Sequence, residues 1–117
     1  MTIYSLILNN SPWGEIQFQN EIMPGIVKVE TAGHGGICLS PLLAAQIPDY
    51  LKKRSAACQG IWWEEDCAWS LPILYLLSCR KNLVNEEIFL LEYADETARQ
   101  WYRSEYKKIR RAALAYR

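Results

Sequence analysis

The stretch Gly60–Ser78, GIWWEEDCAWSLPILYLLS, decides the fold of this 117-residue chain because it is the most apolar segment. It contains three of the five tryptophans, and three acidic residues precede its longest apolar run. Acidic side chains in the first turn of a helix complement its unpaired N–H groups, so the stretch predicts a central helix that begins near Glu64. The spacing of Trp62, Trp69 and Ile73 predicts one wide, buried stripe on this helix.

Pro72 lies inside the predicted helix. Proline lacks an N–H group, and its ring clashes with the carbonyl group four residues back. We therefore expect either a kink at Pro72 or a helix that restarts with Ser70 as its N-cap.

The segments before this stretch have strand and turn signals. Apolar or alternating runs at 3–8, 14–19, 26–31 and 37–39 predict strands, with Ile16 and Phe18 facing inward and a Pro-Gly turn at 24–25. Ser40-Pro41 is typical of a helix start, and short helical turns are expected up to residue 54. Together with the central helix, this order predicts an α+β fold, a small antiparallel sheet of three to four strands with helices packed on one face.

The last third of the chain predicts a long basic helix. Ile88–Tyr93 fits a last strand or the first turns of this helix, and a strand is favoured; Asp95 is then the N-cap of a helix to about Ala115. Four basic residues at steps of four, four and three share one face of it, namely Arg99, Arg103, Lys107 and Arg110. This face is the predicted partner-binding site.

Composition and charge indicate one globular domain, residues 1–117. Half of the residues are hydrophobic, and 13 Lys and Arg balance 13 Asp and Glu. The charge is uneven, because residues 1–95 carry six basic and eleven acidic residues whereas residues 96–117 carry seven and two. The apolar run 68–79 is too short to span a bilayer, and the first residues lack the basic segment of a secretion signal, so we expect a cytoplasmic protein without a membrane partner.

The segment Gly33–Gly36 places three glycines around the only histidine, His34. Such a backbone can approach an anion, and a histidine can act as a general base near neutral pH. A possible ligand loop therefore contains His34, Gly35, Gly36, Glu64 and Asp66. No P-loop or dinucleotide-binding pattern is present, and glycines that supply positive φ beside a locally bonded histidine explain the segment more simply.

The four cysteines, Cys38, Cys58, Cys67 and Cys79, do not have the paired spacing of zinc sites, so no metal and no cofactor are predicted. A small hydrolase or transferase would need His34 with Cys38, Cys67 or Cys79 and an orienting acid such as Asp66. Nucleic-acid binding is a further alternative, because Trp101, Tyr102 and Tyr106 lie among basic residues. The neutral net charge argues against it, and the oligomeric state stays open.

Four motifs together resemble a known family: Ser11-Pro-Trp-Gly14, Pro24-Gly-Ile26, Thr31-Ala-Gly-His-Gly-Gly-Ile-Cys-Leu-Ser40 and Trp62-Trp-Glu-Glu-Asp-Cys-Ala-Trp69. The family is a domain of unknown function in short proteins of proteobacteria, their plasmids and phages, and the resemblance covers residues 11–70. It brings no established activity, cofactor or fold. It implies a mobile-element setting, in which small proteins often block host defence machinery, anti-CRISPR proteins among them. The expectation is therefore a non-enzymatic inhibitor in the host cytoplasm that occludes a host protein, such as a CRISPR–Cas or other defence component.

Overall fold

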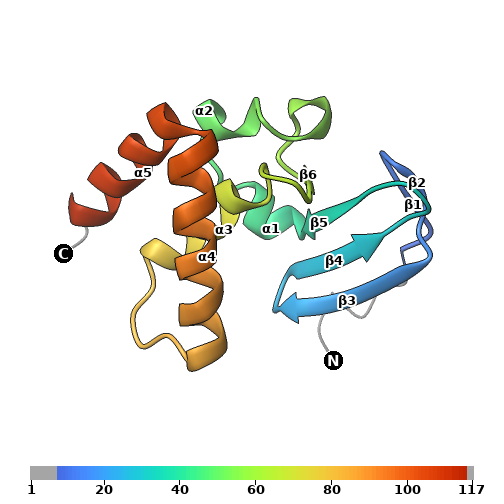
Figure 1. Ribbon diagram of the computed structural model, residues 1–117, viewed down its shortest axis with the longest axis horizontal. Coiled ribbons are helices and arrows are strands. Elements are labelled where there is room, and N and C mark those ends of the chain that lie inside the picture. Colours follow the sequence, from blue (N-terminus) through green and yellow to red (C-terminus); the bar gives the residue numbers. More distant parts are fainter. Residues whose placement is uncertain (1–7, 116–117) are drawn as a thin grey trace. The chain divides into compact units, whose positions relative to one another are not determined.

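The computed structural model describes residues 8–115, and the chain divides into two compact units, Met1–Asp66 and Cys67–Arg117 (Figure 1). The strands lie within residues 10–64 and pair antiparallel, and the longer helices follow within residues 70–115. The predicted α+β class is therefore confirmed. The strand expected at 3–8 lies outside the described residues except for Leu8, and the single domain stays a prediction. Among the described helices, none has the length and apolarity needed to cross a membrane.

The first unit is built on a four-stranded antiparallel sheet in the order β3-β4-β5-β6 (Figure 1). Its strands are β3 (Phe18–Met23), β4 (Ile26–Glu30), β5 (Gly35–Leu39) and β6 (Trp62–Glu64). A separate two-stranded ladder precedes it, with β1 (Asn10–Ser11) and β2 (Gly14–Glu15). Three short helical segments lie between β5 and β6: α1 (Pro41–Ala44), α2 (Asp49–Lys52) and the 3₁₀ segment η2 (Ala56–Cys58).

Local sequence signals set the two turns around β4 and β5. Gly25 has φ 89° in the predicted Pro-Gly turn, a conformation that glycine adopts without a Cβ clash. The predicted helix start at Ser40 is confirmed, because its Oγ accepts a hydrogen bond from the Leu43 N–H at 3.3 Å. The Ser40 N–H in turn donates to the Gly25 carbonyl at 2.8 Å, which ties the helix start to the turn.

The inward orientation predicted for Phe18 is wrong, since its side chain is 55% exposed. Residues 14–19 do not form one strand: β2 ends at Glu15 and β3 begins at Phe18. Between them the Ile16 N–H donates to the Asn9 carbonyl at 3.0 Å. The chain bends between β2 and β3, so the alternation of inward and outward side chains does not continue from Ile16 to Phe18. Ile16 is only half-buried.

Close packing of strands β5 and β6 depends on Gly36, which pairs with Glu64. A Cβ at Gly36 would overlap the carbonyl oxygen of Trp63 and would lie 2.5 Å from Cη2 of Trp13. Trp13 also packs edge-on against Trp62, with ring centroids 5.9 Å apart. The glycine therefore leaves room for a tryptophan on the sheet, which no other residue type would do.

The second unit consists of three helices, α3 (Ser70–Ser78), α4 (Asn85–Trp101) and α5 (Arg103–Ala115). Helix α3 packs against both of the others. Four of its apolar side chains have no exposed surface, namely Leu71, Ile73, Leu74 and Leu77. The predicted buried central helix is thus confirmed for residues 70–78.

The predicted start of this helix near Glu64 is wrong. Residues 62–64 form the edge strand β6, because their backbone completes the ladder with β5. The helix begins at Ser70, where a restart was expected, although the Ser70 hydroxyl donates to the Cys67 carbonyl at 2.7 Å and does not cap the helix. Pro72 is the third helical residue, so its missing N–H is one that has no partner within a helix.

The strand favoured at Ile88–Tyr93 is also wrong, because helix α4 already begins at Asn85. The Glu87 carboxylate accepts a hydrogen bond from the Val84 N–H at 3.0 Å, so this N–H group at the helix start has a partner. The long helix expected from residue 95 to residue 115 is interrupted at Tyr102, which has φ −136° and ψ 58°. The basic residues predicted on one straight face therefore lie on two helices.

We predict that Gly36→Ala lowers the free energy of unfolding by roughly 1–3 kcal/mol, because the new methyl group overlaps the backbone of β6 and the ring of Trp13. Urea unfolding followed by tryptophan fluorescence measures this change. Gly33→Ala is the matched control, since a Cβ at Gly33 meets nothing within 4 Å. Equal stabilities of the two variants would show that the close approach at Gly36 does not exist.

We also predict that Trp69→Ala costs roughly 3–5 kcal/mol of stability. Trp69 is 8% exposed and packs on Tyr93 with ring centroids 5.0 Å apart, so its removal leaves a large cavity. Trp101→Ala is the control, because Trp101 is 63% exposed and its loss should change stability by less than about 0.5 kcal/mol. A melting temperature of Trp69→Ala that equals that of the wild type would contradict the burial of Trp69.

Candidate functional site

The loop around His34 is held by Thr31. The Thr31 hydroxyl donates to the His34 carbonyl at 2.7 Å and accepts from the His34 N–H at 3.2 Å. The Thr31 N–H donates to the same carbonyl at 2.8 Å. These hydrogen bonds hold the turn, and they satisfy the backbone N–H and carbonyl groups of His34.

The residues of the predicted ligand loop do come together, because strands β5 and β6 pair. Gly36 lies opposite Glu64, and the Glu65 N–H donates to the Gly35 carbonyl at 3.0 Å. The Glu65 carboxylate lies over Gly35, where a Cβ would be 2.7 Å from Oε2. The Glu64 carboxylate accepts a hydrogen bond from the Asp66 N–H at 2.8 Å and so stabilises its own turn.

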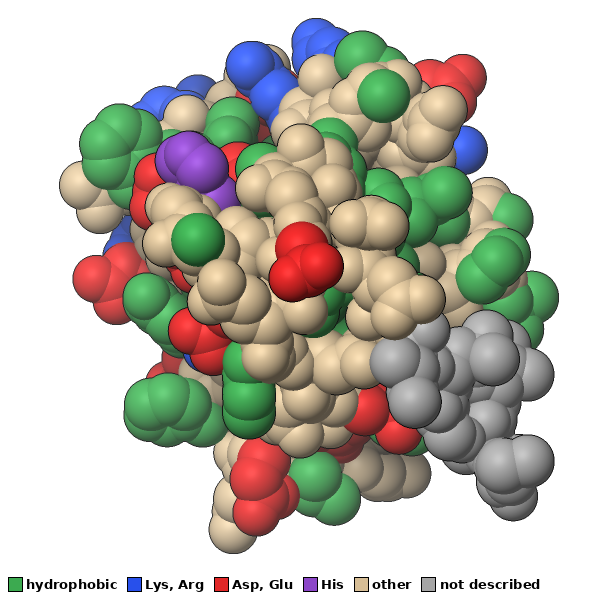
Figure 2. All heavy atoms as spheres, turned by 90° about the vertical axis from the view of Figure 1, so that its right-hand side faces the viewer, with side chains coloured by type: hydrophobic (Ala, Val, Ile, Leu, Met, Phe, Trp, Pro, Cys, Tyr) green, Lys and Arg blue, Asp and Glu red, His purple; other side chains and the backbone are tan. Residues whose placement is uncertain are grey.

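The His34 side chain points to solvent, and Figure 2 shows this single histidine at the surface. Within residues 8–115, its imidazole makes no hydrogen bond or ion pair. The same residues contain no group of three His, Cys, Asp or Glu side chains placed to hold a metal ion. The loop is therefore a turn beside the acidic end of strand β6.

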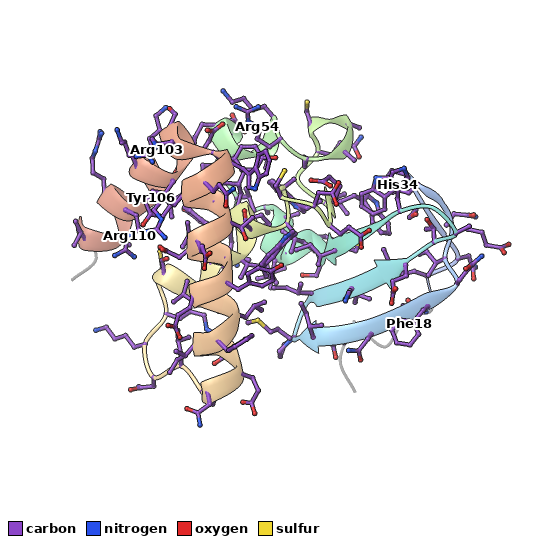
Figure 3. All side chains as sticks on the ribbon, viewed as in Figure 1. Phe18, His34, Arg54, Arg103, Tyr106 and Arg110 are labelled. Atoms are coloured by element: carbon purple, nitrogen blue, oxygen red, sulfur yellow. The ribbon has the colours of Figure 1, made fainter. Side chains whose placement is uncertain are left out.

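The basic side chains of the predicted binding face are arranged by the break at Tyr102. Arg99 lies on α4, whereas Arg103, Lys107 and Arg110 lie on α5. We call these four residues the basic corner. Figure 3 shows Arg103 and Arg110 along α5. Among the described residues, none of the four forms a salt bridge.

Tyr106 connects the two helices of the basic corner. Its hydroxyl donates to Oδ2 of Asp95 at 3.4 Å. Burial and the Asp95 carboxylate raise the pKa of Tyr106, whereas Arg110 and Arg99 lower it. Both arginines are therefore within electrostatic reach of one hydroxyl although they belong to different helices. The Tyr106 hydroxyl therefore links α5 to α4 at the basic corner.

Helix α4 has an exposed groove that the sequence analysis missed. Phe89, Glu92, Tyr93 and Glu96 line a space of about 350 Å³, and we call it the α4 groove. Phe89 is 74% and Tyr93 is 58% exposed. Tyr93 rests on the buried Trp69, so the aromatic floor of the groove is held in place.

The two acids of the α4 groove differ from Glu87 and Asp95 of the same helix. Glu87 pairs with Arg80 at 3.1 Å, and Asp95 accepts the hydrogen bond from Tyr106. In the described part of the chain, neither Glu92 nor Glu96 has a hydrogen bond or an ion pair. The groove thus combines exposed aromatic rings with two carboxylates that have no ion pair among the described residues.

A signal for this surface was present in the sequence. Glu86 and Glu87 fit the first turn of a helix, and Leu91, Ala94 and Ala98 follow at steps of three and four. Reading these residues as one helix would have turned Phe89 and Tyr93 away from the buried stripe. The apolar run 88–91 obscured this pattern because it also fits a strand.

The cysteines do not form a nucleophilic pair with His34 in the first unit. Cys38 lies four residues further along the extended chain, which corresponds to about 13 Å. Burial raises the pKa of Cys38 to about 11 and also raises the pKa of Cys79. In the second unit, Sγ of Cys67 lies 3.2 Å from the Tyr102 hydroxyl. The chemistry of Cys38 is therefore that of an apolar thiol.

We predict that Cys38 reacts slowly with iodoacetamide in the folded protein. A shift of the pKa from 9.0 to about 11 lowers the thiolate fraction at about pH 8 roughly a hundredfold. The rate should rise as the pH approaches 11, and it should rise in urea at constant pH. Peptide mass spectrometry measures the modification, with the exposed Cys58 as the internal control. Equal rates for Cys38 in the folded and the urea-unfolded chain would contradict this prediction.

Comparison with known proteins identifies a family. The family model described as Domain of unknown function (DUF7007) matches residues 7–117. No curated protein and no solved structure shows significant similarity to the chain. The match extends well beyond the motifs at residues 11–70 and includes the helices that form the basic corner and the α4 groove. The chain therefore belongs to the DUF7007 family of domains of unknown function.

Proposed function

We propose that this chain is a non-enzymatic protein-binding domain that acts by occluding a surface of another protein. The observation that carries the proposal is the basic corner, whose four basic side chains lie on two helices and form no salt bridge among the described residues. Arginine is among the residue types that dominate binding energy at protein interfaces. Trp101, another such type, is 63% exposed at the end of α4.

The basic corner favours an acidic surface as its partner. Helix α5 carries five Lys and Arg residues and one Glu, and the Glu is buried. The side of the helix opposite the basic face is anchored by Ile109 and Ala113, which are 1% and 2% exposed. An anchored helix presents its charges in a fixed array, and such an array speeds association with a complementary surface.

The motifs at residues 11–70 supply the setting of the proposal. Their resemblance to short proteins of proteobacteria, plasmids and phages favours a protein encoded by a phage or another mobile element. Its partner would then be a host defence component in the cytoplasm, as for anti-CRISPR proteins. The fixed backbone of the His34 loop supports binding rather than catalysis as the mode of action.

Nucleic-acid binding is the second candidate, because the exposed Trp101 lies between Arg99 and Arg103, two residues from each. Stacking on tryptophan beside cations is how proteins hold single strands. The two candidates differ in the salt dependence of binding. This dependence is steep for nucleic acid, because Lys and Arg side chains that bind phosphates release the counterions condensed on the strand.

We predict that Arg103→Glu with Lys107→Glu weakens capture of the partner from a host-cell lysate at least roughly tenfold, mainly through slower association. Melting temperature should stay nearly unchanged, because both side chains are exposed. Quantitative mass spectrometry of the captured proteins measures the effect. Lys28→Glu with Lys53→Glu is the matched control, since it makes the same change of net charge at exposed positions of the first unit.

His34→Ala tests whether capture depends on the histidine that a hydrolase or transferase would use. This variant should capture the partner as well as the wild type does. Capture that survives the reversal at Arg103 and Lys107 would overturn the assignment of the basic corner. Binding of single-stranded DNA that the reversal abolishes would favour the second candidate.

A further inference from the structure

The exposed face of α5 and the α4 groove have complementary chemistry within the same chain. The groove offers the rings of Phe89 and Tyr93 together with two carboxylates that have no ion pair among the described residues. Helix α5 offers Lys107 and Arg110, and Leu114 on the same face is 62% exposed. One surface is aromatic and acidic, and the other is aliphatic and basic.

The spacing of the two surfaces also agrees. Along α4, Phe89 is followed by Glu92 and Glu96, at steps of three and four residues. Against the chain direction of α5, Leu114 is followed by Arg110 and Lys107, at steps of four and three. Each set spans seven residues, which is about 10.5 Å of helix at 1.5 Å per residue. An antiparallel pair of helices would therefore bring each member of one set opposite a member of the other.

We infer that the α4 groove binds helix α5 of a second copy of this chain. Leu114 of one copy packs on Phe89 and Tyr93 of the other, Arg110 lies at Glu92, and Lys107 lies at Glu96. Basic side chains extend their aliphatic stems over apolar surface and keep the charge at the rim. The rings of Phe89 and Tyr93 suit such stems and add a cation–π attraction. The contact of Tyr93 with Trp69 holds the aromatic floor before binding, so little side-chain entropy is lost.

The arrangement is self-complementary, because every copy carries both surfaces. A two-fold dimer then makes the same contact twice, which is the usual symmetry of homodimers. Repetition also supplies the area that one pair of short helices lacks, since a stable interface needs about 800 Å² from each partner. The inference goes beyond the proposed function but involves two of its residues, so self-association and capture of an acidic partner compete for Lys107 and Arg110.

Sedimentation velocity of the full chain over a range of concentrations and salt tests the inference. The wild type should form a dimer that weakens as salt rises, because the rim contacts are ionic. Glu96→Lys should raise the dissociation constant at least roughly tenfold, since both copies of the contact exchange attraction for repulsion. Lys107→Glu should do the same. An equimolar mixture of the two variants should recover the heterodimer, in which one of the two contacts has its charges exchanged and remains attractive.

Phe89→Ser and Leu114→Ser test the apolar half of the contact. Both side chains are exposed, so each variant should keep the melting temperature of the wild type and lose the dimer. The matched controls for Glu96→Lys and Lys107→Glu are Glu15→Lys and Lys28→Glu, at exposed positions of the first unit. These two variants should leave the dimer unchanged. A wild type that stays monomeric up to millimolar concentration would overturn the inference, as would a dimer that is insensitive to Glu96→Lys.

The outcome is separable from that of the proposed function. Glu96→Lys removes self-association but leaves every residue of the basic corner in place. This variant should therefore capture the host partner at least as well as the wild type. Loss of capture together with loss of the dimer would support self-association through the α4 groove and would overturn the assignment of capture to the basic corner alone.

Discussion

Helix α3 is apolar on nearly all sides, and the second unit depends on the burial of its apolar side chains by neighbouring helices. Leu71, Ile73, Leu74 and Leu77 lose all their exposed surface, although they point in different directions around the helix axis. One partner helix covers one side of such a helix, so α4 and α5 both pack on it. Each of these two helices then contributes one apolar side to α3 and leaves its other side in solvent.

The exposed sides of α4 and α5 differ in charge, and this difference is the basis of the functional argument. The groove on α4 contains carboxylates and aromatic rings, whereas α5 exposes arginine and lysine side chains. The break at Tyr102 allows α5 to leave the axis of α4, and Tyr106 joins the two helices through Asp95. Two exposed surfaces of opposite chemistry are therefore built from the helices α4 and α5.

The first unit illustrates how a conspicuous motif can have a structural role. The glycines around His34 suggested a ligand loop, and β5–β6 pairing did bring the loop to the acidic residues. Yet Gly36 is required because the Trp13 ring and the β6 backbone leave no room for a Cβ. The Thr31 hydroxyl forms hydrogen bonds with the backbone N–H and carbonyl groups of His34. The surface that supports a binding role lies in the second unit, in a segment that the sequence interpretation assigned in part to a strand.

The sequence by itself determined the α+β class, the Pro-Gly turn, the Ser40 helix start, the buried helix at residues 70–78 and the basic character of the last helix. All of these depend on local spacing, caps and charge, which act over a few neighbouring residues. Only the tertiary structure decided that Trp62–Glu64 is a strand, because the partner that completes its ladder lies far away in the sequence. The same holds for the break at Tyr102 and for the ring contact between Trp69 and Tyr93. Such contacts between distant residues are fixed by packing, and no local pattern encodes them.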